Sequence, residues 1–206
     1  GDRVLSVAFS PEGRYILSGG RDGTLLVWDA NNREVVYRLD EHDDSIESVA
    51  GGAGTAVSGS SDGTVRVWAL GAEEPLQTLA VDDTPGGTLG FTPSGDRWLL
   101  GSPAGGVRFY DATSDYDDLL ETFGVTRPVT SFALSADGGL LAAATSARTI
   151  DIWETTNRQR LIRFPEAHTG RINTLAFAPG GRLVLSGSAD ARSEEHTSEL
   201  QSRMFI

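Results

Sequence analysis

The sequence of 206 residues contains neither cysteine nor lysine. Without cysteine the chain can form no disulfide, no thiolate nucleophile and no cysteine-ligated metal site. Without lysine it can form neither a Schiff base nor a phosphate loop of the Walker type, which needs a lysine beside the bound phosphates. These two absences exclude several large classes of enzyme and nucleotide-binding protein.

Positive charge is also scarce. The 17 basic residues face 29 acidic ones, which gives a net charge of −12. A surface that binds nucleic acid needs an excess of positive charge, so we expect no nucleic-acid partner. No apolar run is long enough to span a bilayer, and we expect no membrane partner. No signal peptide is visible, and the expected location is the cytoplasm.

What the sequence does contain is a repeated strand–turn–strand pattern. Apolar and polar side chains alternate around Asp62-Gly63, and residues 18–29 repeat the design around Asp22-Gly23. Alternation with period 2 indicates strands, and Asp-Gly favours a tight turn because glycine adopts positive φ. Aromatic residues recur 40, 42 and 43 residues apart, at Trp28, Trp68, Tyr110 and Trp153. A fixed period of this length indicates a repeat architecture.

Each repeat contains four strand-like runs, and a turn rich in glycine and proline follows the first run in most of them. These turns lie at 10–14, 92–95, 135–138 and 178–181. We place the repeats at about 4–44, 45–86, 87–127, 128–170 and 171–191. The pattern predicts an all-β protein of four-stranded antiparallel units, with a fifth unit limited to two strands at 172–178 and 183–187.

These features resemble the WD-repeat family of β-propellers over about residues 4–191. The resemblance is carried by Trp28-Asp29, the two Asp-Gly turns, the turn 10–14, and His42 and His168 shortly before new repeats. It implies four-stranded blades around a central channel, in an incomplete propeller of four blades and part of a fifth. The sequence departs from the family pattern where Glu41 and Ala167 replace the glycine before each histidine.

The resemblance also implies a buried hydrogen-bonded chain of histidine, serine, aspartate and tryptophan within a blade. The candidate members are His42, Ser58, Asp62 and Trp68 in the second repeat, His168, Ser186 and Asp190 in the fifth, and Ser18, Asp22 and Trp28 in the first. In the third and fourth repeats the serine and aspartate positions hold Leu100, Ala104, Ala143 and Ala147. The polar members are thus absent together, as expected where a half-satisfied buried network costs more than an apolar one.

His42 has an alternative interpretation. Asp43 and Asp44 follow it directly in the sequence, and the resemblance places Asp62 beside it. It could be a general base or a metal ligand. We favour the structural interpretation, since serine and aspartate recur at matching offsets in three repeats, and a catalytic triad has no reason to recur by repeat. The sequence therefore predicts no catalytic, metal-binding or cofactor-binding residue.

Two acidic runs lie in the loops that join one repeat to the next. They comprise Asp40, Glu41, Asp43 and Asp44 before the second repeat and Asp82 and Asp83 before the third. The resemblance places these loops on one face of a propeller. One interpretation is a rim that binds a basic segment of a partner; the alternative is solvated surface charge.

The C-terminal segment breaks the period. Asp22 and Asp62 are each followed six residues later by tryptophan, whereas Asp190 is followed by His196. Residues 192–202 resemble the translation of a common sequencing adapter, and 203–206 fit its continuation. We therefore expect 192–206 to be a non-native tail on a fragment of a longer protein.

The expected function is that of a non-catalytic scaffold or sensor that contacts a protein or peptide, and the acidic loops favour a basic one. Arginine without lysine, beside abundant alanine and glycine, is typical of a GC-rich coding sequence. The resemblance implies bacterial relatives in which such modules adjoin a signalling domain, so we expect part of a larger signalling protein. The alternative is a propeller enzyme, either a hydrolase or a quinone-dependent dehydrogenase, with catalytic residues lining its channel.

Overall fold

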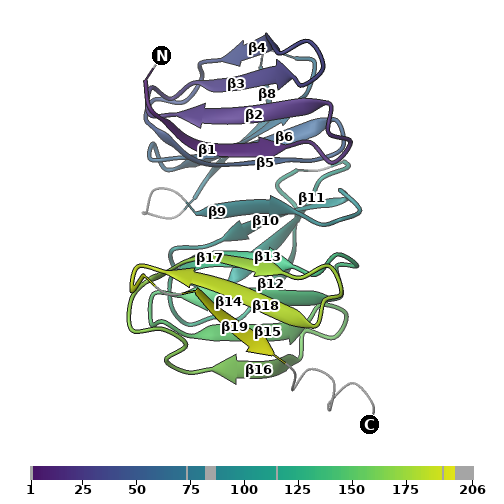
Figure 1. Cartoon of the computed structure of the whole chain (residues 1–206). Coiled ribbons are helices and arrows are strands. Elements are labelled where there is room, and N and C mark those ends of the chain that lie inside the picture. Colours follow the sequence, from purple (N-terminus) through teal and green to yellow (C-terminus); the bar gives the residue numbers. More distant parts are fainter. Residues whose placement is uncertain (1, 73, 82–86, 115, 192, 198–206) are drawn as a thin grey trace. The chain divides into compact units, whose positions relative to one another are not determined.

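The computed structural model describes residues 2–72, 74–81, 87–114, 116–191 and 193–197. Over these residues the regular structure consists of β-strands, and no segment forms a helix. The strands build successive antiparallel sheets along the chain, which Figure 1 shows from purple to yellow. The expectation of an all-β repeat protein is thereby confirmed.

The first three sheets have four strands each, in sequence order across the sheet. The first contains β1 (Val4–Phe9), β2 (Tyr15–Gly20), β3 (Leu25–Asp29) and β4 (Glu34–Leu39). The second contains β5 (Ile46–Gly51), β6 (Thr55–Ser60), β7 (Thr64–Ala69) and β8 (Pro75–Ala80). The third contains β9 (Thr88–Phe91), β10 (Arg97–Gly101), β11 (Val107–Asp111) and β12 (Leu119–Phe123).

The fourth sheet also has four strands and the fifth has three. The fourth contains β13 (Val129–Leu134), β14 (Leu140–Thr145), β15 (Ile150–Glu154) and β16 (Arg160–Phe164). The fifth contains β17 (Ile172–Phe177), β18 (Leu183–Ser188) and β19 (Ser193–Thr197). The chain divides into two compact units: Gly1–Leu100 with Arg108–Thr122, and Gly101–Val107 with Phe123–Ile206.

The Asp-Gly pairs form the predicted hairpin turns. Gly23 and Gly63 have φ values of 75° and 83°, a left-handed conformation that side chains disfavour. The carboxylate of Asp22 accepts the backbone N–H of Thr24 at 3.2 Å, and Asp62 accepts that of Thr64 at 2.8 Å. These bonds fix the connections between β2 and β3 and between β6 and β7.

The core lies between neighbouring sheets. On β7, Val65 and Val67 are buried in a cluster with third-sheet residues that include Trp98. The opposite face of the second sheet carries Trp68, which is buried in a cluster with first-sheet residues that include Leu17. Successive strand residues point to opposite faces, so one strand serves two interfaces. In the second unit, the fourth and fifth sheets share a cluster of the same kind.

Serine hydroxyls also join neighbouring sheets. Ser6 Oγ accepts the backbone N–H of Val49, and Ser48 Oγ accepts that of Leu89, both at 3.1 Å. The same bond joins the fourth and fifth sheets in the second unit, from Leu175 N to Ser131 Oγ. Each serine follows a register shift in the first strand of its sheet. The irregularity lets the first strand bond both its own sheet and the next one.

The expectation of only two strands in the fifth sheet is wrong. β19 pairs with β18 in antiparallel register, from Gly187 opposite Ser193 to Leu183 opposite Thr197. A backbone ladder needs only an extended segment with free N–H and C=O groups, so the pairing does not require apolar side chains. Ser193 and Glu194 are exposed on this strand. Residues 192 and 198–206 of the expected tail lie outside the described residues.

The residue types along β19 differ from those of β3, the third strand of the first sheet. In the first sheet Val27 stands opposite Leu17 and Trp28 opposite Ile16. In the fifth, Glu195 stands opposite Leu185 and His196 opposite Val184. The register therefore supplies polar residue types at the positions where the first sheet has apolar ones.

We predict that chains ending at residue 191 and at residue 206 have the same melting temperature within about 2 °C, which corresponds to less than about 1 kcal/mol at this size. The reason is that residues 193–199 contain no large apolar side chain to bury. Differential scanning calorimetry of the two chains is the measurement. A melting temperature several degrees higher for the longer chain would show that the segment is a native element.

Candidate functional site

A buried polar network links the loop between the first and second sheets to the second sheet. His42 lies between β4 and β5, and its Nε2 is 2.8 Å from Ser58 Oγ on β6. Its Nδ1 is 2.8 Å from the carboxylate of Asp62 in the β6–β7 turn. Trp68 Nε1 on β7 donates to the same Ser58 Oγ at 2.8 Å. The structure thus brings the four candidate residues of the second repeat together in one connected chain.

The hydrogen-bond donors and acceptors around His42 define its protonation state and its tautomer. Ser58 Oγ accepts from the tryptophan N–H, so its own O–H is available to donate to Nε2 of His42. Nδ1 then carries the proton and donates to the Asp62 carboxylate. Thr64 adds its N–H and O–H to the other oxygen of that carboxylate, at 2.8 and 2.6 Å. A neutral histidine satisfies every polar group of the network.

The pKa values of His42 and Asp62 are both lowered. Burial has the largest effect on His42 and moves its pKa below the ordinary 6.5, against the opposing effect of the Asp62 carboxylate. For Asp62, burial acts to raise the pKa, but hydrogen bonds from Thr64 and His42 outweigh it and lower the pKa from 3.8 to about 2. The network therefore holds an ionised carboxylate beside a neutral imidazole at neutral pH.

The connectivity is that of a serine–histidine–aspartate relay, yet the setting prevents catalysis there. Ser58 has no exposed surface, and its Oγ is shared with the indole N–H. The His42 side chain is equally inaccessible. A nucleophilic serine must reach a substrate carbonyl, and no substrate reaches a fully buried hydroxyl.

The fifth and first sheets hold related arrangements. In the fifth, His168 Nε2 is 2.7 Å from Ser186 Oγ, and its Nδ1 is 3.1 Å from the nearer oxygen of Asp190. In the first, Trp28 Nε1 donates to Ser18 Oγ at 2.9 Å. The fifth sheet thus connects all three of its candidate residues, whereas the first connects Ser18 with Trp28, and Asp22 bonds within its own turn.

The third sheet replaces the network by aromatic stacking, which the sequence patterns did not reveal. The rings of Trp98 and Tyr110 are parallel with centroids 4.1 Å apart, and Trp98 Nε1 donates to the backbone oxygen of Tyr116. The sequence feature that could have indicated this stacking is an aromatic residue on each of two neighbouring strands, β10 and β11. Leu100, at the serine position, is buried.

The fourth sheet holds an ion pair between a buried aspartate and an exposed arginine, which sequence reasoning also missed. Asp151 on β15 is buried and accepts two parallel bonds from Arg163 on β16, at 2.8 and 2.9 Å. A bidentate arginine satisfies a carboxylate well inside a protein. The available signal was a lone aspartate inside the apolar strand Ile150–Glu154, followed by a strand rich in arginine. Ala143, at the serine position of this sheet, is fully buried.

The acidic loop before β5 comprises Asp40, Glu41, Asp43 and Asp44, and all four residues are exposed. Arg38 Nε pairs with Asp40 at 2.8 Å, and Arg66 Nη1 lies 3.4 Å from Glu41. Asp43 donates its backbone N–H to the carboxylate of Asp62, which connects the loop to the buried network. Asp82 and Asp83, the other expected members of the rim, lie outside the described residues.

The neighbouring turn also constrains this loop. A Cβ atom at Gly23 would lie 2.6 Å from the backbone oxygen of His42, so the β2–β3 turn must carry a glycine to pass so close. The acidic loop is thus held between the turn of the first sheet and the turn of the second.

The part of the chain that the structure describes contains no cluster of three histidine, aspartate or glutamate side chains able to hold a metal ion. Across those same residues, no helix long and apolar enough to cross a membrane is present.

Four four-stranded antiparallel sheets and one three-stranded sheet follow one another along the chain, and within each unit successive sheets pack face to face, as in repeats of the β-propeller type. The family model of the WD domain, G-beta repeat, matches residues 1–29, 33–69 and 159–192. These stretches contain the three serine–aspartate pairs described above. The chain belongs to the WD-repeat family, as an incomplete propeller.

Curated relatives are WD-repeat and related proteins of low identity. The chain is 24% identical to the transcriptional corepressor LEUNIG_HOMOLOG of Arabidopsis thaliana over 92% of its length, but spans 24% of that protein. It is 27% identical to the guanine nucleotide-binding protein subunit beta-1 of Nicotiana tabacum, over 91% of this chain and 54% of the relative. It is 27% identical to the WD repeat-containing protein SL1-17 of Schistosoma mansoni, over 86% of this chain and 59% of the relative. These relatives are eukaryotic, and a bacterial source stays a prediction.

We predict that His42→Ala lowers the free energy of unfolding by about 1–3 kcal/mol, because Ser58 and Asp62 each lose a buried hydrogen-bond partner. Urea denaturation of the variant and the parent chain measures the change. His196→Ala, in the segment that we expect to be non-native, is the matched control and should leave the stability unchanged. Equal stability of His42→Ala and the parent would refute a structural role for this histidine.

The lowered pKa of His42 predicts a specific pH dependence. The unfolded chain binds a proton at this residue near pH 6.5 and the folded chain only at lower pH, so the contribution is complete above pH 6.5 and is lost as the pH falls. The difference in unfolding free energy between the parent and His42→Ala should therefore narrow from pH 7 to pH 5. Asp62 remains ionised throughout this window. A difference that is constant or grows towards pH 5 would contradict the assignment.

Proposed function

We propose that this chain is a non-catalytic protein-interaction module of a larger signalling protein, and that its acidic loop, residues 40–44, contacts a basic segment of the partner. The proposal rests chiefly on the connection of this exposed loop to the buried network through His42 and Asp43. Two relatives are named as a transcriptional corepressor and as a subunit of a guanine nucleotide-binding protein, and these names support a protein-interaction role.

The geometry of the loop favours binding over mere solubility. A loop anchored at His42 and Asp43 loses little conformational entropy when a partner binds it. Arg38 and Arg66 balance Asp40 and Glu41, whereas Asp43 and Asp44 extend the negative surface at the same loop. The net charge of −12 adds long-range attraction for a cationic partner. We include Asp82 and Asp83 in the same proposed surface.

The test is the titration of an arginine-rich peptide into the chain at about 50 mM and about 150 mM salt, monitored by fluorescence anisotropy. We expect Asp43→Asn combined with Asp44→Asn to weaken binding about two- to tenfold, since each exposed ion pair contributes about 0.2–1 kcal/mol. We also expect weaker binding at the higher salt concentration.

The matched control removes two negative charges elsewhere in the first unit. Glu12 lies in the β1–β2 turn and Glu34 begins β4, at the strand ends opposite the acidic loop. Both residues are exposed. Glu12→Gln combined with Glu34→Gln should leave the affinity within about a factor of two. Equal losses in both double variants would indicate non-specific attraction by net charge and would overturn the assignment to the loop.

A further inference from the structure

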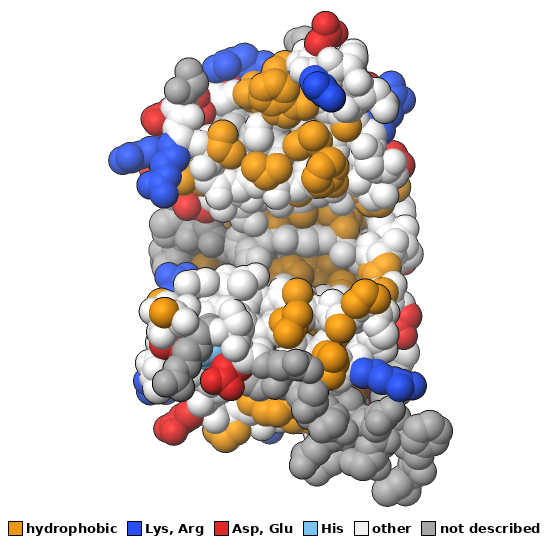
Figure 2. All heavy atoms as spheres, in the orientation of Figure 1, with side chains coloured by type: hydrophobic (Ala, Val, Ile, Leu, Met, Phe, Trp, Pro, Cys, Tyr) orange, Lys and Arg blue, Asp and Glu red, His pale blue; other side chains and the backbone are white. Residues whose placement is uncertain are grey.

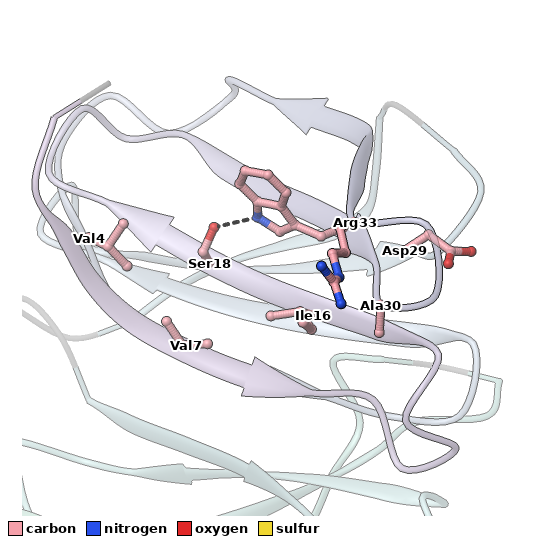
Figure 3. A pocket seen from close by; sticks show the side chains of 8 residues that line it. Val4, Val7, Ile16, Ser18, Asp29, Ala30 and Arg33 are labelled. Carbon is pink, nitrogen blue, oxygen red and sulfur yellow. Dashed lines mark hydrogen bonds between the residues drawn. The ribbon is translucent and has the colours of Figure 1, made fainter.

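The first sheet exposes apolar side chains in two places, and Figure 2 shows hydrophobic side chains gathered over this sheet. One place is a hollow of about 350 Å³ lined by residues that include Val4, Val7 and Ile16, which Figure 3 shows from close by. The other is β4, the outermost strand of the sheet, where Val35 and Val36 are 43% and 40% exposed. Charged residues are placed symmetrically about the second place, and this arrangement points to a partner.

The exposure of Val36 has its cause inside the sheet. The register between β3 and β4 shifts between Val27 and Trp28, so Val36 is an extra residue of β4 that stands opposite no residue of β3. Such a bulge bends the strand and redirects its side chains. β8 carries the same shift, and its extra residue, Leu76, is 43% exposed. The second sheet packs against both the first and the third, so exposure at this position arises from the bulge and not from a missing neighbour.

Two charges of opposite sign flank Val36 at equal spacing. Glu34 precedes it by two residues and Arg38 follows it by two. Both are exposed, with 58% of the Arg38 side chain accessible. Arg38 donates through Nε to Asp40 at 2.8 Å and through Nη2 to Thr24 at 3.2 Å, and its Nη1 is a further donor for a second carboxylate. Read in either direction, β4 therefore presents one charge, an apolar centre and the opposite charge.

This pattern makes the strand complementary to itself. A two-fold axis beside a strand pairs it with an antiparallel copy, so that residue i faces residue j and j faces i. An axis at Val36 places Glu34 of each copy opposite Arg38 of the other, and Val35 opposite Tyr37. Opposite charges and apolar residues that face each other across neighbouring strands are stabilising. A parallel arrangement in the same register would instead oppose like charges.

The outermost strands of the second, third and fourth sheets lack this pattern. β8 contains no charged residue, and β12 contains one glutamate and no basic residue. β16 contains two arginines and no acidic residue. None of these strands can place opposite charges against a second copy of itself, so self-complementarity favours β4.

We propose that β4 packs edge to edge against β4 of a second copy of this chain, about a two-fold axis at Val36, with Glu34 of each copy paired to Arg38 of the other. The contact is distinct from the partner surface proposed above and does not depend on it. It involves one strand of each copy, so we expect a small interface and a weak, concentration-dependent dimer. The net charge of −12 opposes the approach of two copies at low salt.

The test is sedimentation velocity of the full chain over a range of concentrations at about 150 mM salt, where long-range repulsion is screened. Val36→Asp brings two like charges together at the axis, and we expect it to weaken dimerisation at least about tenfold. The matched control is Leu76→Asp, which places the same charge at the corresponding bulge of β8 and should leave dimerisation unchanged. Val7→Asp, in the hollow, should also leave it unchanged.

Exchange of the flanking charges tests the register of the contact. Glu34→Arg alone and Arg38→Glu alone each oppose like charges, and we expect each to weaken dimerisation about five- to thirtyfold. Glu34→Arg also makes the net charge less negative, which by itself would favour association, so a loss in this variant comes from the local contact. An equimolar mixture of the two variants should dimerise as the parent does, because one chain offers two positive charges and the other two negative ones.

Four results would overturn the proposal. They are absence of self-association, equal effects of Val36→Asp and Leu76→Asp, a mixture that dimerises no better than either charge variant alone, and self-association that Val7→Asp abolishes. The last result would assign the contact to the hollow. Circular dichroism verifies the fold of each variant. If Val36→Asp alters the spectrum, the mixture decides, because it compares two chains with each other and leaves Val36 in place.

Discussion

The sheets of this chain have two apolar faces, and a sheet cannot cover either face by itself. Residues alternate along each strand, so β7 directs Val65 and Val67 to one interface and Trp68 to the other. Burial of these residues therefore requires a neighbour on both sides, which is the physical reason that WD repeats occur in series. The hydrogen bonds that Val49 and Leu89 donate to serine hydroxyls set the spacing between neighbours. Where none of the described residues covers such a face, as at Val4 and Val7, the apolar side chains are exposed.

The histidine network is secondary to this packing but determines the arrangement of the loops. In the second sheet it joins the β4–β5 loop, the β6–β7 turn and two strands through hydrogen bonds to a single buried imidazole. The third sheet does without it: Trp98 and Tyr110 stack there, and the indole N–H of Trp98 donates to the backbone oxygen of Tyr116. The two solutions share one rule: the polar members of the histidine network are either hydrogen-bonded to one another or replaced together.

Much of this could be predicted from the sequence. The period, the Asp-Gly turns and the alternation of apolar residues predicted the four-stranded sheets, because each of these signals is local. The network itself was implied by the resemblance to the WD-repeat family, and its serine could be chosen because a serine stands four residues before the turn aspartate in three repeats. The Asp151–Arg163 pair could not be predicted from the sequence, since it depends on which residues stand opposite each other on two strands. The register between two strands cannot be determined from the sequence of either strand alone.

The fifth sheet shows why backbone pairing and side-chain packing must be judged separately. The sequence indicated that residues 193–199 could pack no core, and from this we expected no third strand. The backbone of β19 nevertheless forms a regular ladder with β18, because the edge of β18 offers N–H and C=O groups to any extended segment. The register then places Glu195 and His196 where the first sheet has Val27 and Trp28. A ladder of this kind adds a strand to the sheet, with polar residue types at register positions where the first sheet has apolar ones.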